Sequence, residues 1–286
     1  MNDHDKRRRF RDILASSSGS VAPSAPDPMF ARLIQDCGYP LVHLAGNGMH
    51  RSLLLADRSL VTMTEMADRA ATIARVLDVP LMADGETGYG GPEQTARSVK
   101  LFERAGVAGI RFEDSLFGDN GINRMGAGGV TPVDGMVDKI KAAVDARSDE
   151  SLVILIRCDS RQVEPLAALQ ERIATYVAAG ADGIGVTISD AAELREVGAH
   201  PPAPLVNPWP RAGINSTDEL FAIGFKIALM TSFVSLAALA AARSMLLNLR
   251  QTGRVDGYVA EADGYPEIRR WYEDLGFRPT QPFVSE

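Results

Sequence analysis

Short apolar runs alternate with longer stretches of helical periodicity along most of the chain. Eight of these runs predict strands, because apolar residues stand together between turn-forming residues. They span Ser20–Pro23, Leu41–Ala45, Leu81–Asp84, Gly109–Glu113, Val153–Arg157, Gly183–Thr187, Pro204–Asn207 and Lys226–Met230. Strands that alternate with helices pair in parallel through right-handed crossovers. The pattern therefore predicts an α/β fold, a closed (β/α)8 TIM barrel, with an open doubly wound sheet as the alternative.

Helix signals lie between the predicted strands. Thr131–Asp134 offers an N-cap threonine, a proline at the first helical position and an acid in the first turn. The helical stretch Leu166–Ala179 ends at Gly180, a residue suited to a helix C-terminus, and Ser216–Glu219 opens another helix. Close to the N-terminus, we expect a surface helix over Phe10–Ala15.

The C-terminal part of the chain contains an apolar segment that needs a membrane check. Ile227–Leu247 carries a single charge, Arg243, and is rich in alanine and serine. A membrane helix needs about 20 strongly apolar residues, so the segment is interpreted as a strand followed by a buried helix. We expect residues 1–286 to form a single barrel domain, in which residues 254–286 are a polar and aromatic tail with a short helix at Pro266–Leu275.

The composition is that of an ordinary soluble globular protein, with 45% hydrophobic and 23% charged residues. The net charge of −7 and the absence of a basic stripe argue against a nucleic-acid partner. Cys37 and Cys158 lack metal-ligand spacing, which favours a reduced, cytoplasmic setting. The basic segment Lys6–Arg11 is not followed by a long apolar run, so neither a signal peptide nor a membrane partner is expected.

The candidate chemistry centres on the segment Met82–Gly91. Its strand delivers Asp84 and Glu86 to a glycine-rich turn, and side chains two positions apart on a strand point the same way. The next strand ends in Glu113. Carboxylates at neighbouring strand ends favour a hard cation such as Mg²⁺, and barrel active sites lie at these ends. The alternative is that the acids only cap the helices that follow.

Other candidates for ligand binding also follow predicted strands. Gly46 and Asn47 end the second strand, where backbone amides can hold an oxyanion or simply form a turn. Asp57, in the loop beyond them, is by itself a surface acid. Arg157 closes the fifth strand, where either a substrate carboxylate or a structural ion pair would compensate its charge. Asn207 closes the seventh strand and can donate hydrogen bonds to a carboxylate.

Nucleophilic catalysis is poorly supported by the sequence. The histidines are His4, His43, His50 and His200, and no Ser-His-Asp set or Cys-His pair emerges. His43 falls inside an apolar strand and is interpreted as a hydrogen-bonded core residue. The acids therefore favour metal-assisted electrostatic catalysis.

Several short motifs extend this interpretation. Asp84–Gly90 resembles an Asp-x-Asp-x-Gly-Tyr-Gly motif, and Phe112–Asp114 resembles Ile-Glu-Asp. Asp27–Arg32 resembles Asp-x-x-Ser-Ala-Arg, Leu60–Met66 resembles Leu-x-Thr-x-Thr-Glu-Met, and Ala178–Ile184 resembles Glu-Ala-Gly-Ala-Asp followed by glycine. By these motifs, nearly the whole chain resembles the isocitrate lyase/phosphoenolpyruvate mutase superfamily.

This resemblance implies a (β/α)8 barrel whose last helix is swapped between the subunits of a homo-oligomer, a homotetramer built as a dimer of dimers. It also implies Mg²⁺ (or Mn²⁺) bound by Asp84, with Glu86 and Glu113 holding the water shell of the ion. The expected small-molecule partner is a 2-oxo or 2-hydroxy carboxylate that chelates the metal.

The resemblance extends to the residues that would hold the substrate. The amides of Gly46 and Asn47 and the side chain of Arg157 would clamp the carboxylate. Asp57 matches an aspartate of the family that lies near the reacting group. The implied chemistry makes or breaks a C–C or C–P bond next to the oxo-acid while the metal stabilises an enolate-like intermediate.

The chain also departs from the family pattern. The loop Ser115–Gly126 lacks the cysteine, histidine and lysine of the lyases' gating loop, and Asp119 stands where the mutases have a lysine. These differences argue against isocitrate-type and phosphonate substrates. The nearest resemblance is to the oxaloacetate decarboxylase branch, although Ser232 or a neighbour replaces a histidine and Glu86 replaces an aspartate. Thr187 stands in place of a glutamate of the lyases.

We therefore predict a magnesium-dependent lyase that cleaves a C–C bond in a small 2-oxo (or 2-hydroxy) dicarboxylate, by oxaloacetate-type decarboxylation through an enolate. The alternatives are a specialised biosynthetic enzyme of the same superfamily with a different substrate, and a non-catalytic ligand-binding relative. The expected functional residues, besides the three acids, are Asp57, Arg157 and Asn207 in catalysis and Gly46, Asn47, Arg157, Asn207 and Ser232 in substrate binding.

Overall fold

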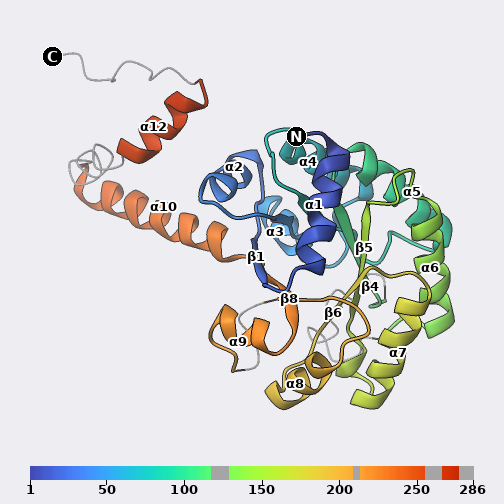
Figure 1. Cartoon of the computed structure of the whole chain (residues 1–286). Coiled ribbons are helices and arrows are strands. Elements are labelled where there is room, and N and C mark those ends of the chain that lie inside the picture. Colours follow the sequence, from blue (N-terminus) through green and yellow to red (C-terminus); the bar gives the residue numbers. More distant parts are fainter. Residues whose placement is uncertain (117–128, 209–212, 255–265, 277–286) are drawn as a thin grey trace. The chain divides into compact units, whose positions relative to one another are not determined.

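Eight parallel strands form a nearly closed barrel in the computed structural model (Figure 1). They are β1 (Ser20–Pro23), β2 (Val42–Leu44), β3 (Leu81–Asp84), β4 (Gly109–Glu113), β5 (Val153–Cys158), β6 (Gly183–Val186), β7 (Leu205–Pro208) and β8 (Phe225–Met230). They pair in the order β1-β8-β7-β6-β5-β4-β3-β2. At the remaining seam, a parallel bridge joins Ser24 to His43, and the Ala25 amide donates to the His43 carbonyl at 2.9 Å. The predicted TIM barrel is confirmed, and the open sheet is excluded.

The structure describes residues 1–116, 129–208, 213–254 and 266–276. The chain divides into two compact units, Met1–Ser235 and Leu236–Glu286. The first unit contains the barrel and all the candidate site residues. The tail predicted to begin at residue 254 lies within the second unit.

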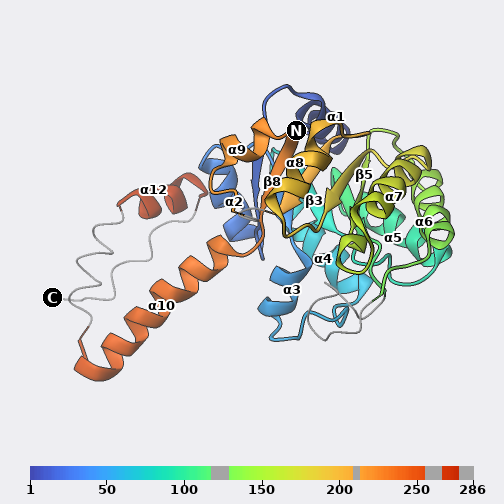
Figure 2. The ribbon, with the colours of Figure 1, turned by 90° about the horizontal axis from the view of Figure 1, so that it is seen from below.

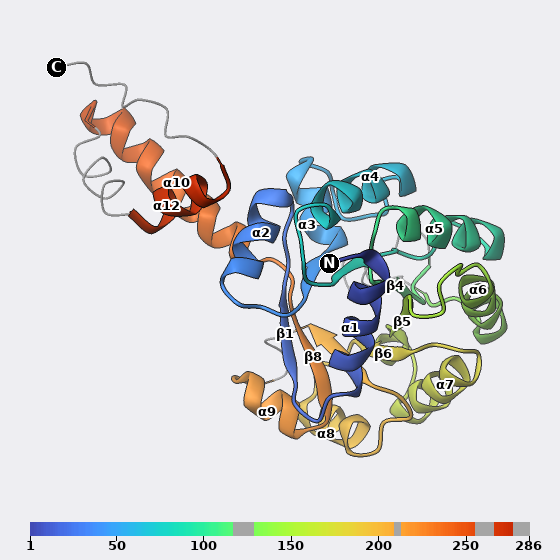
Figure 3. The ribbon, with the colours of Figure 1, turned by 45° about the horizontal axis from the view of Figure 1, so that its top comes forward.

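Helices alternate with the strands and surround the barrel wall (Figure 3). They are α2 (Pro28–Asp36), α3 (Gly46–Ser52), α4 (Met63–Ala74), α5 (Pro92–Arg104), α6 (Val133–Asp145), α7 (Leu166–Ala178), α8 (Ala191–Ala199) and α9 (Thr217–Ala222). Figures 2 and 3 show α5, α6 and α7 following one another along the outside of the wall. Fully buried side chains such as Leu44, Ile110, Ile156 and Tyr176 fill the space between strands and helices. This layer accounts for most of the apolar core.

A second apolar layer fills the inside of the barrel. It is made of Phe10, Ile13, Leu14, Ala22, Leu41, Met82, Ala108, Val153, Leu155, Val206, Ile227 and Leu229. The first three belong to α1 (Asp3–Ala15), which packs at the N-terminal end of the barrel. The expectation of a surface helix over Phe10–Ala15 was therefore wrong, because Phe10 is completely buried and the helix begins seven residues earlier, at Asp3.

Two other local predictions need small corrections. Helix α6 begins at Val133 with Pro132 as its N-cap, so Thr131 is not the cap and instead accepts a hydrogen bond through its carbonyl from Arg172. Helix α7 ends at Ala178 and is followed by Gly180 with φ +110°, as its position after a helix favours. The predicted cap of α9 is confirmed, since the Ser216 side chain accepts from the Glu219 amide.

Helix α10 (Phe233–Thr252) begins in the first unit and continues through the second, which also contains α12 (Pro266–Asp274). The prediction of a buried helix here was wrong for the single chain, because α10 has no buried residue and Leu236, Leu239 and Leu246 are all more than half exposed. By length and composition alone α10 is apolar enough to cross a membrane, and a single such helix among the described residues is weak evidence for a membrane span. In α12, the rings of Trp271 and Tyr272 pack at 5.1 Å.

Candidate active site

The predicted acids lie at the C-terminal ends of neighbouring strands. Asp84 ends β3, and Glu113 ends β4 in register with Arg157 of β5. The turn after β3 bends back onto β4, because the Gly85 amide donates to the Arg111 carbonyl at 2.8 Å and the Glu113 amide donates to the Glu86 carbonyl at 2.9 Å. Parallel pairing therefore brings Asp84, Glu86 and Glu113 to one end of the barrel, as the sequence predicted.

The turn after β3 has an unusual backbone. Glu86 and Tyr89 have φ values of +50° and +60°, which non-glycine residues rarely adopt, and Gly88 has φ +86°. Such conformations persist when the surrounding structure holds them, and they are common at functional sites. The Glu86 side chain is 5% exposed. The turn therefore places a carboxylate in a buried position that a relaxed strand end would not give.

Asp84 is surrounded by hydrogen-bond donors. Its Oδ2 accepts from the Gly46 amide at 2.6 Å. Its Oδ1 accepts from Nε of Arg111 at 3.0 Å, lies 2.7 Å from Nη2 of the same guanidinium and lies 3.4 Å from Nε2 of His43. Burial by itself would raise the pKa of Asp84, but Arg111, followed by His43 and the Gly46 amide, holds the pKa well below its usual range. Asp84 is therefore ionised at neutral pH.

His43 supports Asp84 from the neighbouring strand. Its ring is fully buried, and Nδ1 lies 2.9 Å from the Ser24 hydroxyl. Burial lowers the pKa of His43 despite the opposing effect of Asp84, so the ring is neutral. A neutral ring that donates from Nε2 to Asp84 accepts from Ser24 at Nδ1. His43 is the hydrogen-bonded core residue that the sequence predicted, and it also orients a site residue.

Gly46 leaves room for two carboxylates. A Cβ atom at this position would lie 2.1 Å from Oε1 of Glu86 and 3.4 Å from Oδ2 of Asp84. Both side chains thus approach the same point, and any residue larger than glycine would displace Glu86. The Gly46 amide, expected to hold a substrate carboxylate, donates to Asp84 in this structure. Asn47, the next residue of α3, has a buried side-chain oxygen without a hydrogen-bond partner among the described residues.

Glu113 and Arg157 form a buried ion pair. Nη1 of Arg157 lies 3.1 Å from Oε2 of Glu113, and its Nε donates to Asp159 at 2.9 Å and to the Thr187 hydroxyl at 3.2 Å. Burial raises the pKa of Glu113 to about 7, against the opposing effect of Arg157. For Arg157, burial is outweighed by Asp159 and Glu113, which raise its pKa. The structural ion pair left open by the sequence is therefore present, and a bound carboxylate would share Arg157 with these acids.

Asp57 and Ser232 are linked to the site through α3. Nε2 of His50 accepts from the amides of Leu60 and Val61, both at 3.2 Å, so Nδ1 carries the proton. That Nδ1 donates to the Gly46 carbonyl at 2.8 Å and lies 3.5 Å from Oδ1 of Asp57. His50 thus connects the Asp57 loop to Gly46, a role that the sequence did not reveal.

Ser232 lies in the loop between β8 and α10. Its hydroxyl accepts from Nη1 of Arg51 at 2.7 Å, and the contact is exposed. Ser232 is therefore attached to α3 by Arg51.

Asn207 sits apart from the acids in the hydrogen-bond pattern. It is fully buried, aligned with Ala228 of β8, and its Oδ1 accepts from the Val186 amide at 3.4 Å. Its side-chain nitrogen has no partner among the described residues. The structure thus leaves a donor available on Asn207 but does not link it to Asp84, Glu86 or Glu113.

Several buried polar atoms have no hydrogen-bond partner among the described residues. Within the described residues they include Asn47 Oδ1, Tyr89 Oη, Arg111 Nη1 and Asn207 Nδ2. Burial raises the pKa of Tyr89, and the charges of Glu86, Asp84 and Glu113 raise it further, so its hydroxyl is neutral. Buried polar groups are nearly always satisfied in folded proteins. Unsatisfied groups beside carboxylates indicate a place where a ligand or water belongs.

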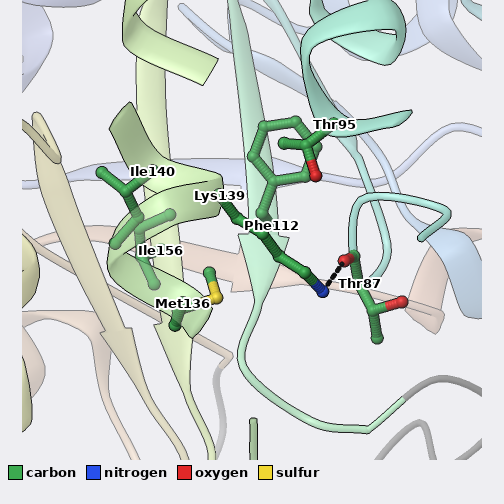
Figure 4. Close-up of a pocket in the computed structure, with 7 residues that line it drawn as sticks. All are labelled: Thr87, Thr95, Phe112, Met136, Lys139, Ile140 and Ile156. Carbon is green, nitrogen blue, oxygen red and sulfur yellow. Dashed lines mark hydrogen bonds between the residues drawn. The ribbon is translucent and has the colours of Figure 1, made fainter. Parts of the chain in front are cut away.

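A narrow pocket lies behind the turn that carries Glu86 (Figure 4). Lys139 of α6 reaches through it and donates from Nζ to the Thr87 carbonyl at 3.0 Å. Burial lowers the pKa of Lys139. The pocket is lined by Thr87, Thr95, Phe112, Met136, Lys139, Ile140 and Ile156. Lys139 therefore ties α6 to the turn that carries Glu86.

The acids fit a water-rich cation site better than a closed protein cage. Among the described residues, no three His, Cys, Asp or Glu side chains are close enough to form a complete set of ligands. Mg²⁺ commonly uses one or two carboxylates and keeps several waters. The shared space at Gly46 between Asp84 and Glu86 and the unsatisfied Tyr89 hydroxyl suit such hydrated binding. The sequence of the loop Ser115–Gly126 distinguishes the branches of the family. Residues 117–128 lie outside the described part of the chain.

A TIM barrel with a buried acidic group at the C-terminal ends of its strands is the class of protein that this structure defines. The family profile of phosphoenolpyruvate phosphomutase matches residues 10–250. The chain therefore belongs to this family, within the phosphoenolpyruvate mutase/isocitrate lyase superfamily.

Named relatives support the assignment. A probable 2-methylisocitrate lyase 1 of Corynebacterium glutamicum is 32% identical over 283 residues, which cover 97% of this chain and 92% of that protein. An oxaloacetate decarboxylase of Pseudomonas fluorescens is 33% identical over 254 residues, covering 88% and 87% of the two chains. The solved structure of an oxaloacetate acetylhydrolase with 3,3-difluorooxalacetate has a TM-score of 0.80 and 28% identity, and covers 97% and 99% of the two chains. The family and these relatives identify an enzyme of the carbon–carbon lyase class.

Proposed function

We propose that the protein is a magnesium-dependent lyase that decarboxylates a small 2-oxo-dicarboxylate of the oxaloacetate type. The observation that carries this proposal is the approach of Asp84 and Glu86 to one point at Gly46, beside the Glu113–Arg157 pair. Two relatives whose names include oxaloacetate, a decarboxylase and an acetylhydrolase, support the substrate class. The 2-methylisocitrate lyases support C–C cleavage, although they act on a different substrate.

The side chains have distinct roles in this proposal. Asp84, kept ionised by Arg111, would be the direct ligand of Mg²⁺ (or Mn²⁺), and Glu86 and Glu113 would bind water molecules of its shell. When bound, the cation supplies a Lewis acid that stabilises the negative charge developing on the oxo-acid as the bond breaks.

Arg157 would bind a substrate carboxylate, since a guanidinium matches a carboxylate with two parallel donors. The buried ion pairs with Glu113 and Asp159 hold its guanidinium in one orientation before the substrate arrives. Asn47 and Asn207 would supply further polar contacts through atoms that have no partner in the described structure. Asp57, positioned by His50, would lie near the reacting group.

The experiment that tests the function measures turnover of a panel of substrates with Mg²⁺: oxaloacetate, methylisocitrate, dimethylmalate and phosphonopyruvate. We expect pyruvate and CO2 from oxaloacetate, loss of the activity in EDTA and its return when Mg²⁺ is added. Turnover of methylisocitrate or dimethylmalate with none of oxaloacetate would replace this proposal by another C–C cleavage. Ligand binding without turnover of any of them would favour a non-catalytic relative.

The exposed α10 supports the proposed homo-oligomer with a swapped C-terminal helix. We also propose that the protein acts in the cytoplasm. The leucines of α10 at positions 236, 239 and 246 are more exposed than is usual for apolar residues of a monomer. We propose that another subunit covers them in a homotetramer. Light scattering coupled to size-exclusion chromatography measures the mass, and a monomer in solution would contradict the proposal.

A further inference from the structure

A buried arginine forms an ion pair with the aspartate that we expect to bind the metal. Arg111 is 5% exposed and lies on β4 in register with Asp84. Residues two apart on a strand share a face, so Arg111 faces the same side as Glu113 and points to the barrel interior. Two of its nitrogens, Nε and Nη2, lie 3.0 and 2.7 Å from Oδ1 of Asp84.

Both oxygens of Asp84 already accept hydrogen bonds from the chain. Oδ1 is held by Arg111, and Oδ2 accepts from the Gly46 amide at 2.6 Å. The Asp84 side chain is only 13% exposed, so its carboxylate would be costly to leave without a counter-charge. Arg111 supplies this charge in the chain itself, so Asp84 does not need a metal ion to be stable in its buried position.

The positive charge of Arg111 also disfavours the binding of a metal cation to Asp84. A divalent ion bound to Asp84 would lie within a few ångströms of the guanidinium, and two positive charges at this distance repel each other appreciably even with the screening typical of a protein site. The third nitrogen, Nη1, is buried and has no hydrogen-bond partner among the described residues. It is therefore a positively charged donor still available to an anion.

We propose that Arg111 is a built-in counter-cation of Asp84, which weakens binding of the free metal ion and strengthens binding of a dianionic substrate together with the metal. This inference rests on the proposed function, because it assumes a divalent cation at Asp84. Arg111 acts here as a positioning and affinity-setting residue. Its effect is to favour the complex of metal with substrate over the complex with metal alone.

The test compares Mn²⁺ binding by the full-length chain and by Arg111→Gln, whose amide can still donate to Asp84 but carries no charge. Free Mn²⁺ is measured by electron paramagnetic resonance, first without and then with saturating oxalate. We expect the Kd for Mn²⁺ alone to fall by about tenfold in the variant, and the Kd for oxalate at saturating Mn²⁺ to rise by about tenfold, on the order of one unit charge at close range. Arg111→Lys, which keeps the charge, should remain close to the wild type in both measurements.

A matched control removes an arginine of a partly buried ion pair elsewhere in the barrel. Arg147 pairs with Asp182 at 3.0 Å near the start of β6, at the other end of the barrel strands. Arg147→Gln should leave both Kd values unchanged. If Arg111→Gln does not fold, as judged by circular dichroism, Arg111→Met gives the same comparison without the charge.

The possible outcomes separate the two proposals. An unchanged or higher Kd for Mn²⁺ alone in Arg111→Gln, or an unchanged Kd for oxalate, overturns the role of Arg111 while leaving the metal site intact. Failure of the wild type and all variants to bind Mn²⁺ overturns the metal site and with it both proposals. A purely structural role of Arg111 would weaken both ligands together, which also contradicts the inference.

Discussion

The two ends of the barrel use the same residue types in opposite ways. At the N-terminal end, Arg7 donates to Asp149 and to the carbonyls of Glu103 and Val107, and Arg11 donates to Asp182 and to carbonyls of the loop before β5. At the C-terminal end, Asp84, Glu86 and Glu113 gather around two arginines, and several buried polar atoms have no partner among the described residues.

This difference is what we expect if the N-terminal end serves stability and the C-terminal end binds ligands. The arginines of the N-terminal end are used to tie α1 to the barrel, and Phe10 closes the interior beneath them. The C-terminal end keeps negative charge and unsatisfied donors in a buried place, an arrangement that costs stability unless something binds there. The division agrees with barrel enzymes in general, in which activity belongs to the C-terminal end.

The largest effect is expected for the central acid. Asp84→Asn should lower kcat/KM for oxaloacetate by at least about a thousandfold, because it removes the charge that holds the cation. The rates are measured by coupled pyruvate detection. Asp182→Asn, an acid of the N-terminal end that is also paired with arginines, is the control and should retain the activity. Equal rates in the wild type and Asp84→Asn would remove the distinction between the two ends.

The second largest effect is expected for Gly46, which leaves room for the carboxylates of Glu86 and Asp84. Gly46→Ala would place a methyl group 2.1 Å from Oε1 of Glu86, so the side chain must move. We expect Mn²⁺ binding and activity to fall by about a hundredfold while the protein still folds, since a small misplacement of catalytic groups is costly. Gly48→Ala, in the same helix, meets nothing closer than 3.9 Å and should behave as the wild type. A fully active Gly46→Ala would contradict the proposed role of Gly46 in leaving room for the two carboxylates.

A substitution at the N-terminal end should change the stability of the protein but not its catalytic activity. Phe10→Ala removes a completely buried ring from the barrel interior, which should lower the free energy of unfolding by about 3–5 kcal/mol. Urea unfolding followed by circular dichroism measures the change, and kcat per folded molecule should stay the same. A loss of activity at unchanged stability would contradict this expectation, because it would mean that packing in the barrel interior controls the positions of the acids.

The smallest effect is a pH dependence of stability at the same end. Burial would raise the pKa of Asp149, but hydrogen bonds from Ser151, Arg7 and His4 lower it below its usual value. A lowered native pKa stabilises the fold above the unfolded-state value near 4, and this contribution is lost as the pH falls further. Asp149→Asn should therefore flatten the loss of stability between about pH 5 and pH 2, by roughly 1 kcal/mol for a partly exposed group. Parallel pH profiles of the two proteins would contradict this assignment.

The positions of residues within single strands could be predicted, because they depend only on the sequence of residues near them along the chain. Strands that alternate with helices predicted parallel pairing, and parallel pairing brings the ends of β3 and β4, with Asp84 and Glu113, to the same end of the sheet. His43 was recognised as a hydrogen-bonded core residue for the same reason, since it stands inside an apolar strand. Helix α1 was misjudged because Phe10 looks like any apolar residue of an amphipathic helix until the barrel interior is known.

The sequence by itself determined the order of strands and helices, the family and the strand ends that carry the acids. Only the tertiary structure decided that Arg111 holds Asp84, that Gly46 makes room for Glu86 and that His50 joins Asp57 to the site. Hydrophobic periodicity records which face of an element is buried, but it does not record which side chain on another strand faces it. Those pairings depend on register and on backbone turns such as the one at Glu86, and they exist only once the barrel has closed.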